Sequence, residues 1–129
     1  KMPRKTFTAG EVLTAANVNT YLSNEQDSTV STATAYTVAT DDRYQVLFFT
    51  AASAVTVTLG TATAFQVGER VDIIQDGAGT VSIVADSGVT FGGAGTTAGT
   101  YTIDGQYDAA TVICKASNEY RVIGAITAV

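Results

Sequence analysis

The chain of 129 residues has no histidine and no tryptophan, and it contains one cysteine, one proline and only 15% charged residues. Without histidine, Ser-His and Cys-His dyads are excluded and the commonest metal ligand is missing. The single cysteine, Cys114, cannot form an intramolecular disulfide, and in the apolar run that begins at Thr111 it is expected to be a small buried side chain. We therefore expect a protein that is not an enzyme and binds no cofactor.

Carboxylates do not alter that expectation. Asp41 and Asp42 are neighbours in a predicted turn, so their side chains should point apart rather than form a catalytic pair. Asp76 and Asp104 also flank turns. A calcium site assembled from such loops stays open as an alternative, although the spacing fits no EF-hand loop.

Long apolar runs are also missing, and none approaches the ~18 residues that a membrane span requires. The formal net charge of −5 argues against a nucleic-acid partner, because phosphate binding needs clustered cations. Lys1, Arg4 and Lys5 hold three of the seven positive charges, which indicates a short basic arm before an acidic body. The arm is either an ordinary solvated terminus or a docking segment for an acidic surface.

Threonine, valine and isoleucine dominate what is present, and they favour β-strands. The clearest strand is 54–59, where Val55, Val57 and Leu59 alternate with threonines. Short strands and turns follow one another from Tyr36 onward, and no helix separates them, which excludes βαβ units. We predict an all-β fold, an antiparallel β-sandwich or barrel of about eight strands preceded by a short N-terminal arm and helix.

The segment from Val67 to Phe91 carries the strongest local signal. Two alternating apolar runs flank Asp76-Gly77-Ala78-Gly79, a sequence suited to a tight turn, and this predicts a β-hairpin at the centre of the fold. A second turn is expected at Ala116-Ser-Asn-Glu, before a closing strand from Tyr120 to Ile126. The glycine-rich stretch from Gly92 to Gly99 is predicted to be a flexible tip.

The N-terminal region differs from the rest. A turn is predicted at Gly10, and Thr14 is a candidate N-cap for a helix that begins after it. Val18 and Leu22 lie four residues apart on one face, and Leu13 can pack on Val18 as a hydrophobic staple. The predicted organisation is an anchoring arm and helix (1–26), a polar segment that is a linker or a loosely held strand (27–35), and a β-sandwich domain (36–129).

The motif T-F-T-A-G-E-V-L-T-A-A-N-V-N-T-Y-L, from Thr6 to Leu22, resembles a segment found at the start of virion structural proteins of tailed bacteriophages, especially those of actinobacteria. The body, with V-T-V-T-L, F-Q-V-G-E-R-V-D-I-I-Q-D-G-A-G-T-V-S-I-V-A and Y-R-V-I-G-A-I, resembles the β domains of phage fibre and head-decoration proteins. The resemblance implies an assembly component, commonly trimeric, with no catalytic residues. Fibres are usually longer and carry shaft repeats, which favours a compact decoration or baseplate-like protein.

These observations lead to one hypothesis and one alternative. The hypothesis is a non-enzymatic virion protein, either a capsid decoration or a tail-associated protein. It would form a homotrimer through its β domain and bind phage capsid or tail proteins through its arm. The expected anchor residues are Arg4, Lys5, Phe7, Leu13, Val18, Tyr21 and Leu22. The alternative is a receptor- or glycan-binding module of a phage appendage, whose contact surface is the stretch from Gly92 to Gly99 with nearby tyrosines.

Overall fold

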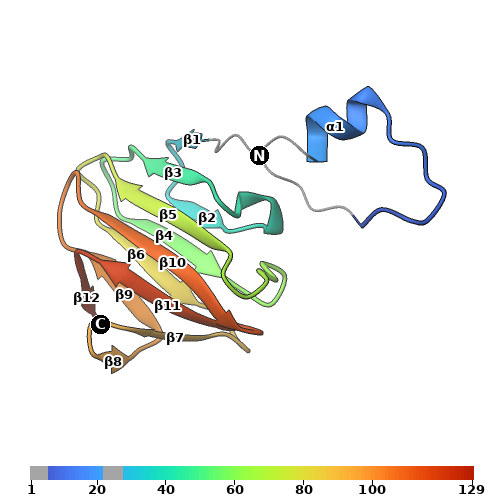
Figure 1. Ribbon diagram of the computed structural model, residues 1–129. Coiled ribbons are helices and arrows are strands. Elements are labelled where there is room, and N and C mark those ends of the chain that lie inside the picture. Colours follow the sequence, from blue (N-terminus) through green and yellow to red (C-terminus); the bar gives the residue numbers. More distant parts are fainter. Residues whose placement is uncertain (1–5, 22–27) are drawn as a thin grey trace.

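The computed structural model describes residues 6–21 and 28–129, in which two β-sheets pack face to face and one helix lies apart from them (Figure 1). The helix α1 spans Ala15–Tyr21, and a single 3-10 turn, η1, spans Thr40–Asp42. Sheet A has seven strands in the order β1 (Ser28–Ser31), β3 (Val46–Phe49), β5 (Arg70–Gln75), β10 (Ala109–Ala116), β11 (Glu119–Gly124), β7 (Thr90–Gly93) and β8 (Thr96–Thr97). Sheet B has five, in the order β12 (Ile126–Ala128), β9 (Thr100–Ile103), β6 (Val81–Ala85), β4 (Val55–Leu59) and β2 (Ala35–Thr37).

The core fills the space between the two sheets. Alternation along the strands sends every second side chain inward, so that Val57, Val71 and Ile83 are completely buried. Aromatic rings meet edge to face across this space, with centroids 5.5 Å apart for Tyr36 and Phe49. All the core side chains that the structure describes come from the segment between residues 36 and 128. The predicted β-sandwich is confirmed.

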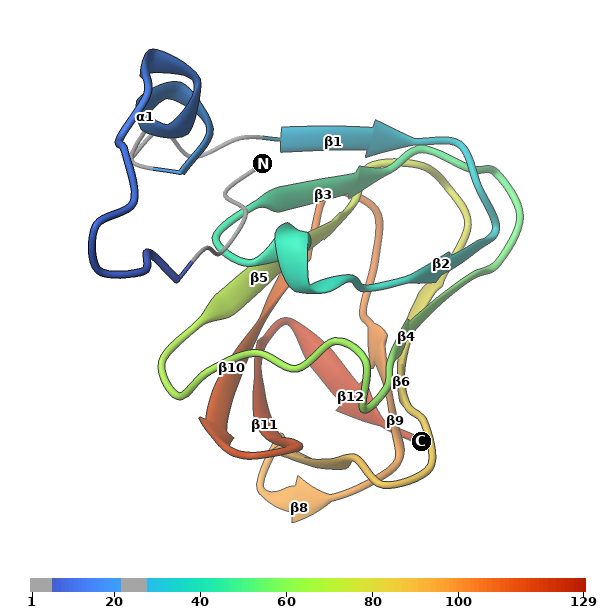
Figure 2. The same cartoon turned by 90° about the vertical axis from the view of Figure 1, so that its right-hand side faces the viewer.

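Strand pairing shows how the chain is wound. From β1 to β6 the strands alternate between the sheets, so that β1, β3 and β5 pair in parallel in sheet A and β2, β4 and β6 do so in sheet B. Each circuit stacks on the previous one around the core, as in a short two-sheeted coil (Figure 2). Strands β9 and β10 then pair antiparallel with β6 and β5. The sheets are therefore mixed rather than antiparallel throughout. A strand of the opposite sheet serves as the crossover that a helix supplies in a βαβ unit.

The predicted hairpin between Val67 and Phe91 is wrong. Its two strands are β5 and β6, which lie in different sheets and do not pair. The connecting glycines are needed for space, because a Cβ atom on Gly77 would overlap the backbone of Thr50, and one on Gly79 the carbonyl group of Ser53. The corner from β5 to β6 thus packs directly on the corner from β3 to β4.

Three other predictions have definite outcomes. The segment predicted as a linker or a loosely held strand contains β1, which pairs with β3. The structure therefore shows a strand in this segment. The turn after Ala116 is confirmed, with Asn118 at a positive φ of 56° between the antiparallel strands β10 and β11. The stretch from Gly92 to Gly99 is no loose tip, since β7 and β8 pair within it and Ala98 packs against the core.

Candidate partner-binding surfaces

The arm from residue 6 to residue 21 folds locally as its sequence predicts. The backbone amide of Glu11 donates a hydrogen bond to the carbonyl oxygen of Thr8 (3.0 Å) across the turn at Gly10, whose φ is +83°. At the start of α1, the amide of Asn17 donates to Oγ1 of Thr14 (3.1 Å), which confirms Thr14 as the N-cap. A helix of only two turns has little stability of its own in water.

The arm presents large apolar side chains to solvent. Phe7, Leu13 and Val18 expose 39%, 53% and 42% of their surface, so these three predicted anchor residues are accessible to a partner. In Figures 1 and 2 the helix lies away from the sandwich. The predicted anchor residues Arg4, Lys5 and Leu22, and the side chain of Tyr21, lie outside the part of the chain that is described.

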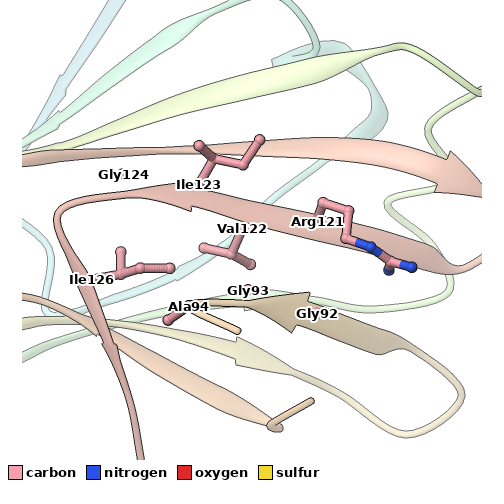
Figure 3. A pocket seen from close by; sticks show the side chains of 8 residues that line it. All are labelled: Gly92, Gly93, Ala94, Arg121, Val122, Ile123, Gly124 and Ile126. Carbon is pink, nitrogen blue, oxygen red and sulfur yellow. The ribbon is translucent and has the colours of Figure 1, made fainter. Parts of the chain in front are cut away.

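Two hollows lie beside the β7–β8 hairpin. The first, of about 380 Å³, opens between β11, β7 and the start of β12. Figure 3 shows Val122 and Ile126 pointing into this space, whereas Ile123 points to the opposite side of β11. Glycine at position 93 allows the two strands to approach, because a Cβ atom there would overlap the carbonyl oxygen of Val122. This hollow is lined mainly by aliphatic side chains and glycine backbone, and Arg121 also contributes to its lining.

The second hollow, of about 460 Å³, is more polar, and residues of β7, β8 and β11 line it. Thr90, Thr97 and Arg121 are among its lining residues. The guanidinium of Arg121 donates to Oε1 of Glu119 (2.9 Å), and Nζ of Lys115 lies 3.3 Å from the same oxygen. These hydrogen bonds, first from Arg121 and then from Lys115, lower the pKa of Glu119. The hollow therefore offers one guanidinium, hydroxyl groups and a carboxylate to a small polar ligand.

The tyrosines nearest this hairpin do not reach either hollow. Tyr101 and Tyr120 are completely buried in the core, and the hydroxyl of Tyr101 donates to the carbonyl oxygen of Thr96 (2.8 Å). The prediction that nearby tyrosines contribute to a ligand-contact surface is therefore wrong for Tyr101 and Tyr120. Tyr107 is exposed, and its backbone amide bonds to the carbonyl of Gln75 in the loop before β10.

A buried polar cluster lies where the chain crosses from sheet B to sheet A. Asp42 is fully buried, and its Oδ2 accepts hydrogen bonds from the hydroxyl of Tyr36 (2.9 Å) and the amide of Ala39 (2.9 Å). Burial, and then the neighbouring carboxylate, raises the pKa of Tyr36. Nearby, Nε of Arg43 lies 3.0 Å from Oε2 of Glu69. Each of these contacts fixes the path of the backbone, in keeping with the turn-forming role predicted for Asp42.

Two findings bear on other classes of site. Within residues 6–21 and 28–129, no three histidine, cysteine or acidic side chains come close enough together to hold a metal ion. None of the helices in the same ranges has the length and apolar character that crossing a membrane requires. Cys114 is buried as predicted, and burial raises the pKa of its thiol.

Sequence reasoning missed one group of residues. In Val46-Leu-Phe-Phe, Ile73-Ile74 and Val122-Ile123, apolar residues occupy both faces of a strand rather than alternate ones. Continuous apolar runs of this kind are typical of strands that are covered on both sides. The signal was present in the sequence, but only the strand register shows that Val46, Phe48, Ile74 and Ile123 lie on the outer face of sheet A, whereas their neighbours along each strand are in the core.

No protein-family model matches the chain, and a search of curated proteins likewise found no match.

Proposed function

We propose that this protein is a non-enzymatic structural subunit of a phage virion, a capsid decoration or tail-associated protein. It attaches to capsid or tail proteins through its N-terminal arm and forms a homotrimer through its β domain. One observation carries the proposal. The arm exposes Phe7, Leu13 and Val18, and none of the three belongs to the described core of the sandwich. The resemblance of residues 6–22 to the start of phage virion proteins supplies the class of partner.

The composition of the arm agrees with docking. Residues 1–5 contribute three positive charges and no negative charge, and the sandwich from residue 28 onward carries nine acidic and four basic side chains. A basic tip followed by an amphipathic helix can bind an acidic, partly apolar surface, because charge guides the encounter and apolar burial stabilises the complex. In this proposal the mature protein resides in the virion, and the sandwich displays its remaining surface outward.

Replacing apolar residues of the arm tests the attachment. The variant Leu13→Asp with Val18→Asp should keep the sandwich fold and lose at least ten-fold in affinity for particles lacking the protein, because both side chains would be buried on docking. The matched control is Ala9→Asp with Ala16→Asp, which adds the same charge to the same segment without removing a large side chain. Cosedimentation with virions measures occupancy. Normal occupancy of the Leu13 and Val18 variant would contradict the proposal.

The alternative, a receptor- or glycan-binding module, is favoured by the two hollows beside β7. In that case Arg121 would contact the ligand, and the variant Arg121→Ala would lose binding in a glycan array or host-cell assay. Absence of binding by the wild-type protein at high concentration would exclude this alternative.

A further inference from the structure

Glycine follows aspartate at two positions of the chain, Asp76-Gly77 and Asp104-Gly105. In such a pair the backbone nitrogen of glycine can attack the aspartate side chain, because no Cβ atom shields that nitrogen. The first pair opens the corner between β5 and β6, and the second opens the corner between β9 and β10. Both aspartates are exposed to solvent, so exposure alone does not distinguish the two pairs.

The peptide group between Asp76 and Gly77 is held on both sides. Its amide donates a hydrogen bond to the carbonyl oxygen of Phe49 (2.9 Å), and its carbonyl oxygen accepts one from Nε2 of Gln106 (3.2 Å). Gly77 is also buried, and a Cβ atom on it would overlap the backbone of Thr50. Rotating this peptide group toward the Asp76 side chain would break both hydrogen bonds and force two packed corners apart.

The peptide group between Asp104 and Gly105 is not held in this way. Neither its amide nor its carbonyl oxygen makes a hydrogen bond to any residue within the ranges 6–21 and 28–129. Beyond the adjacent residues, a Cβ atom on Gly105 would meet only the carboxylate of Asp108, at 3.5 Å, which is an ordinary contact. This peptide group can therefore rotate without breaking a hydrogen bond, and the nitrogen of Gly105 can approach Cγ of Asp104.

We propose that Asp104 is a site of spontaneous isomerisation to isoaspartate, and that the packed corner protects Asp76 from it. The nitrogen of Gly105 attacks Cγ of Asp104, and an N–Cγ bond forms while the hydroxyl of the protonated carboxyl group leaves with the amide proton as water. Water then opens the cyclic imide. Addition at Cγ restores aspartate, whereas addition at the former backbone carbonyl carbon breaks its bond to nitrogen and gives isoaspartate, whose main chain runs through Cγ.

Asp104 connects the end of β9 with β12. Its amide donates to the carbonyl oxygen of Ala125 (2.9 Å), and its Oδ1 accepts a hydrogen bond from the hydroxyl of Thr127 (2.6 Å). Isomerisation adds a methylene group to the main chain and moves the free carboxylate, so it displaces both contacts. Because β12 is the edge strand of sheet B, we expect isomerisation to weaken its pairing with β9 and to leave the rest of the sandwich folded. This chemistry is independent of the proposed function.

Ageing the full chain tests this inference. Folded protein and protein unfolded in guanidinium chloride are kept in mildly acidic buffer at physiological temperature and then digested. Chromatography with electron-transfer fragmentation distinguishes isoaspartate from aspartate in the peptides. In folded protein, Asp104 should convert at least about ten-fold faster than Asp76, because conversion at Asp76 first needs its corner to open. In the unfolded chain the two rates should agree within about two-fold, since glycine follows aspartate at both positions.

Two kinds of variant sharpen the comparison. Gly105→Ala should slow the conversion of Asp104 about ten-fold, because the added methyl group shields the attacking nitrogen, and the contact at 3.5 Å leaves room for it. Asp104→Asn and its matched partner Asp76→Asn keep a side-chain carbonyl oxygen and react through the same imide, with loss of ammonia instead of water. Their reaction is faster and raises the mass of the intact protein, so it decides the comparison where aspartate reacts too slowly to measure.

Conversion of Asp104 alone in folded protein, with conversion at both sites in the unfolded chain, supports the inference. Equal conversion of the two sites in folded protein, or faster conversion of Asp76, overturns it. Protection of both sites by folding also overturns it, because the corner between β9 and β10 would then be as closed as the other. A difference that persists in the unfolded chain assigns the selectivity to neighbouring sequence and overturns the role given to the fold.

Discussion

From β1 to β6 the chain passes between the two sheets at two edges of the sandwich, here called the short rim and the long rim after the length of their connections. The two rims satisfy the polar groups of these connections in different ways. At the short rim the chain crosses from sheet A to sheet B through residues 32–34, 50–54 and 76–80, and the connections stack through backbone hydrogen bonds such as Gly79 N to the carbonyl of Ala51 (3.0 Å). At the long rim it returns through residues 38–45 and 60–69, where Asp42, Arg43 and Glu69 are buried.

The difference concerns how each rim satisfies its polar groups. Stacked corners bond to one another only if the backbones come close, which requires glycine at Gly77 and Gly79. The longer connections leave space between them, and side chains fill it: Thr63 donates to the carbonyl of Val38 (2.7 Å), and the amide of Gln66 donates to Oε1 of Glu69 (2.7 Å). We therefore expect that adding side-chain atoms at the short rim lowers stability, and that removing a buried charged group at the long rim does so too.

The largest effect is expected for Gly79→Ala at the short rim. The new methyl group would overlap the carbonyl of Ser53, and only a backbone shift can relieve this, so the free energy of unfolding should fall by about 4 kcal/mol. The matched control is Gly95→Ala in the β7–β8 turn, where φ is +76° and the surrounding space is open, with an expected loss of about 1 kcal/mol. Urea unfolding monitored by circular dichroism measures both. Equal losses would show that close packing does not distinguish the short rim.

A somewhat smaller effect is expected for Glu69→Gln at the long rim. The change removes the nearer of two carboxylates that pair with Arg43, at 3.0 Å against 4.0 Å for Asp41. Because the Arg43 side chain is only 7% exposed, the free energy of unfolding should fall by about 3 kcal/mol. The double variant Arg43→Met with Glu69→Leu removes both charges and should lose less than the single variant. If the double variant is the less stable of the two, then charge pairing does not explain the burial of these residues.

The smallest effect is expected for Tyr36→Phe, also at the long rim. Losing the hydrogen bond to Asp42 should cost about 1 kcal/mol at neutral pH. Because the fold raises the pKa of Tyr36 above its ordinary value of 10.0, the unfolded chain releases this proton first, and stability contributed by the phenol declines as pH rises above about 10. The wild type should therefore lose more stability than Tyr36→Phe between pH 9 and 11. Parallel stability curves for the two proteins would exclude this linkage.

Much of the local structure could be predicted from sequence because its causes are local. Thr14 caps α1 through its own hydroxyl, and the alternation in β4 already separates its buried from its exposed face. The all-β class follows from β-branched residues and short spacing between turns. The candidate arm was also recognisable, because its apolar side chains occur in a segment that differs in composition from the sandwich.

Strand pairing was less predictable because alternation does not identify a strand's partner. Asp76-Gly77-Ala78-Gly79 has the composition of a hairpin turn, yet the same residues make a corner between sheets, and nothing within the segment distinguishes the two. The apolar runs at Val46 and Ile73 were visible, but assembling them into one face needs the register of β3 against β5. The polar cluster likewise joins residues far apart in sequence.

The sequence by itself determined the all-β class, the capped N-terminal helix and the buried Cys114, since each depends on intrinsic preference or on neighbours within a few residues. Tertiary structure alone decided that the first six strands wind as a parallel coil, that Gly77 and Gly79 are spacers, and that apolar residues gather on one outer face. These features arise from contacts between distant segments, whose geometry exists only once the two sheets have packed together.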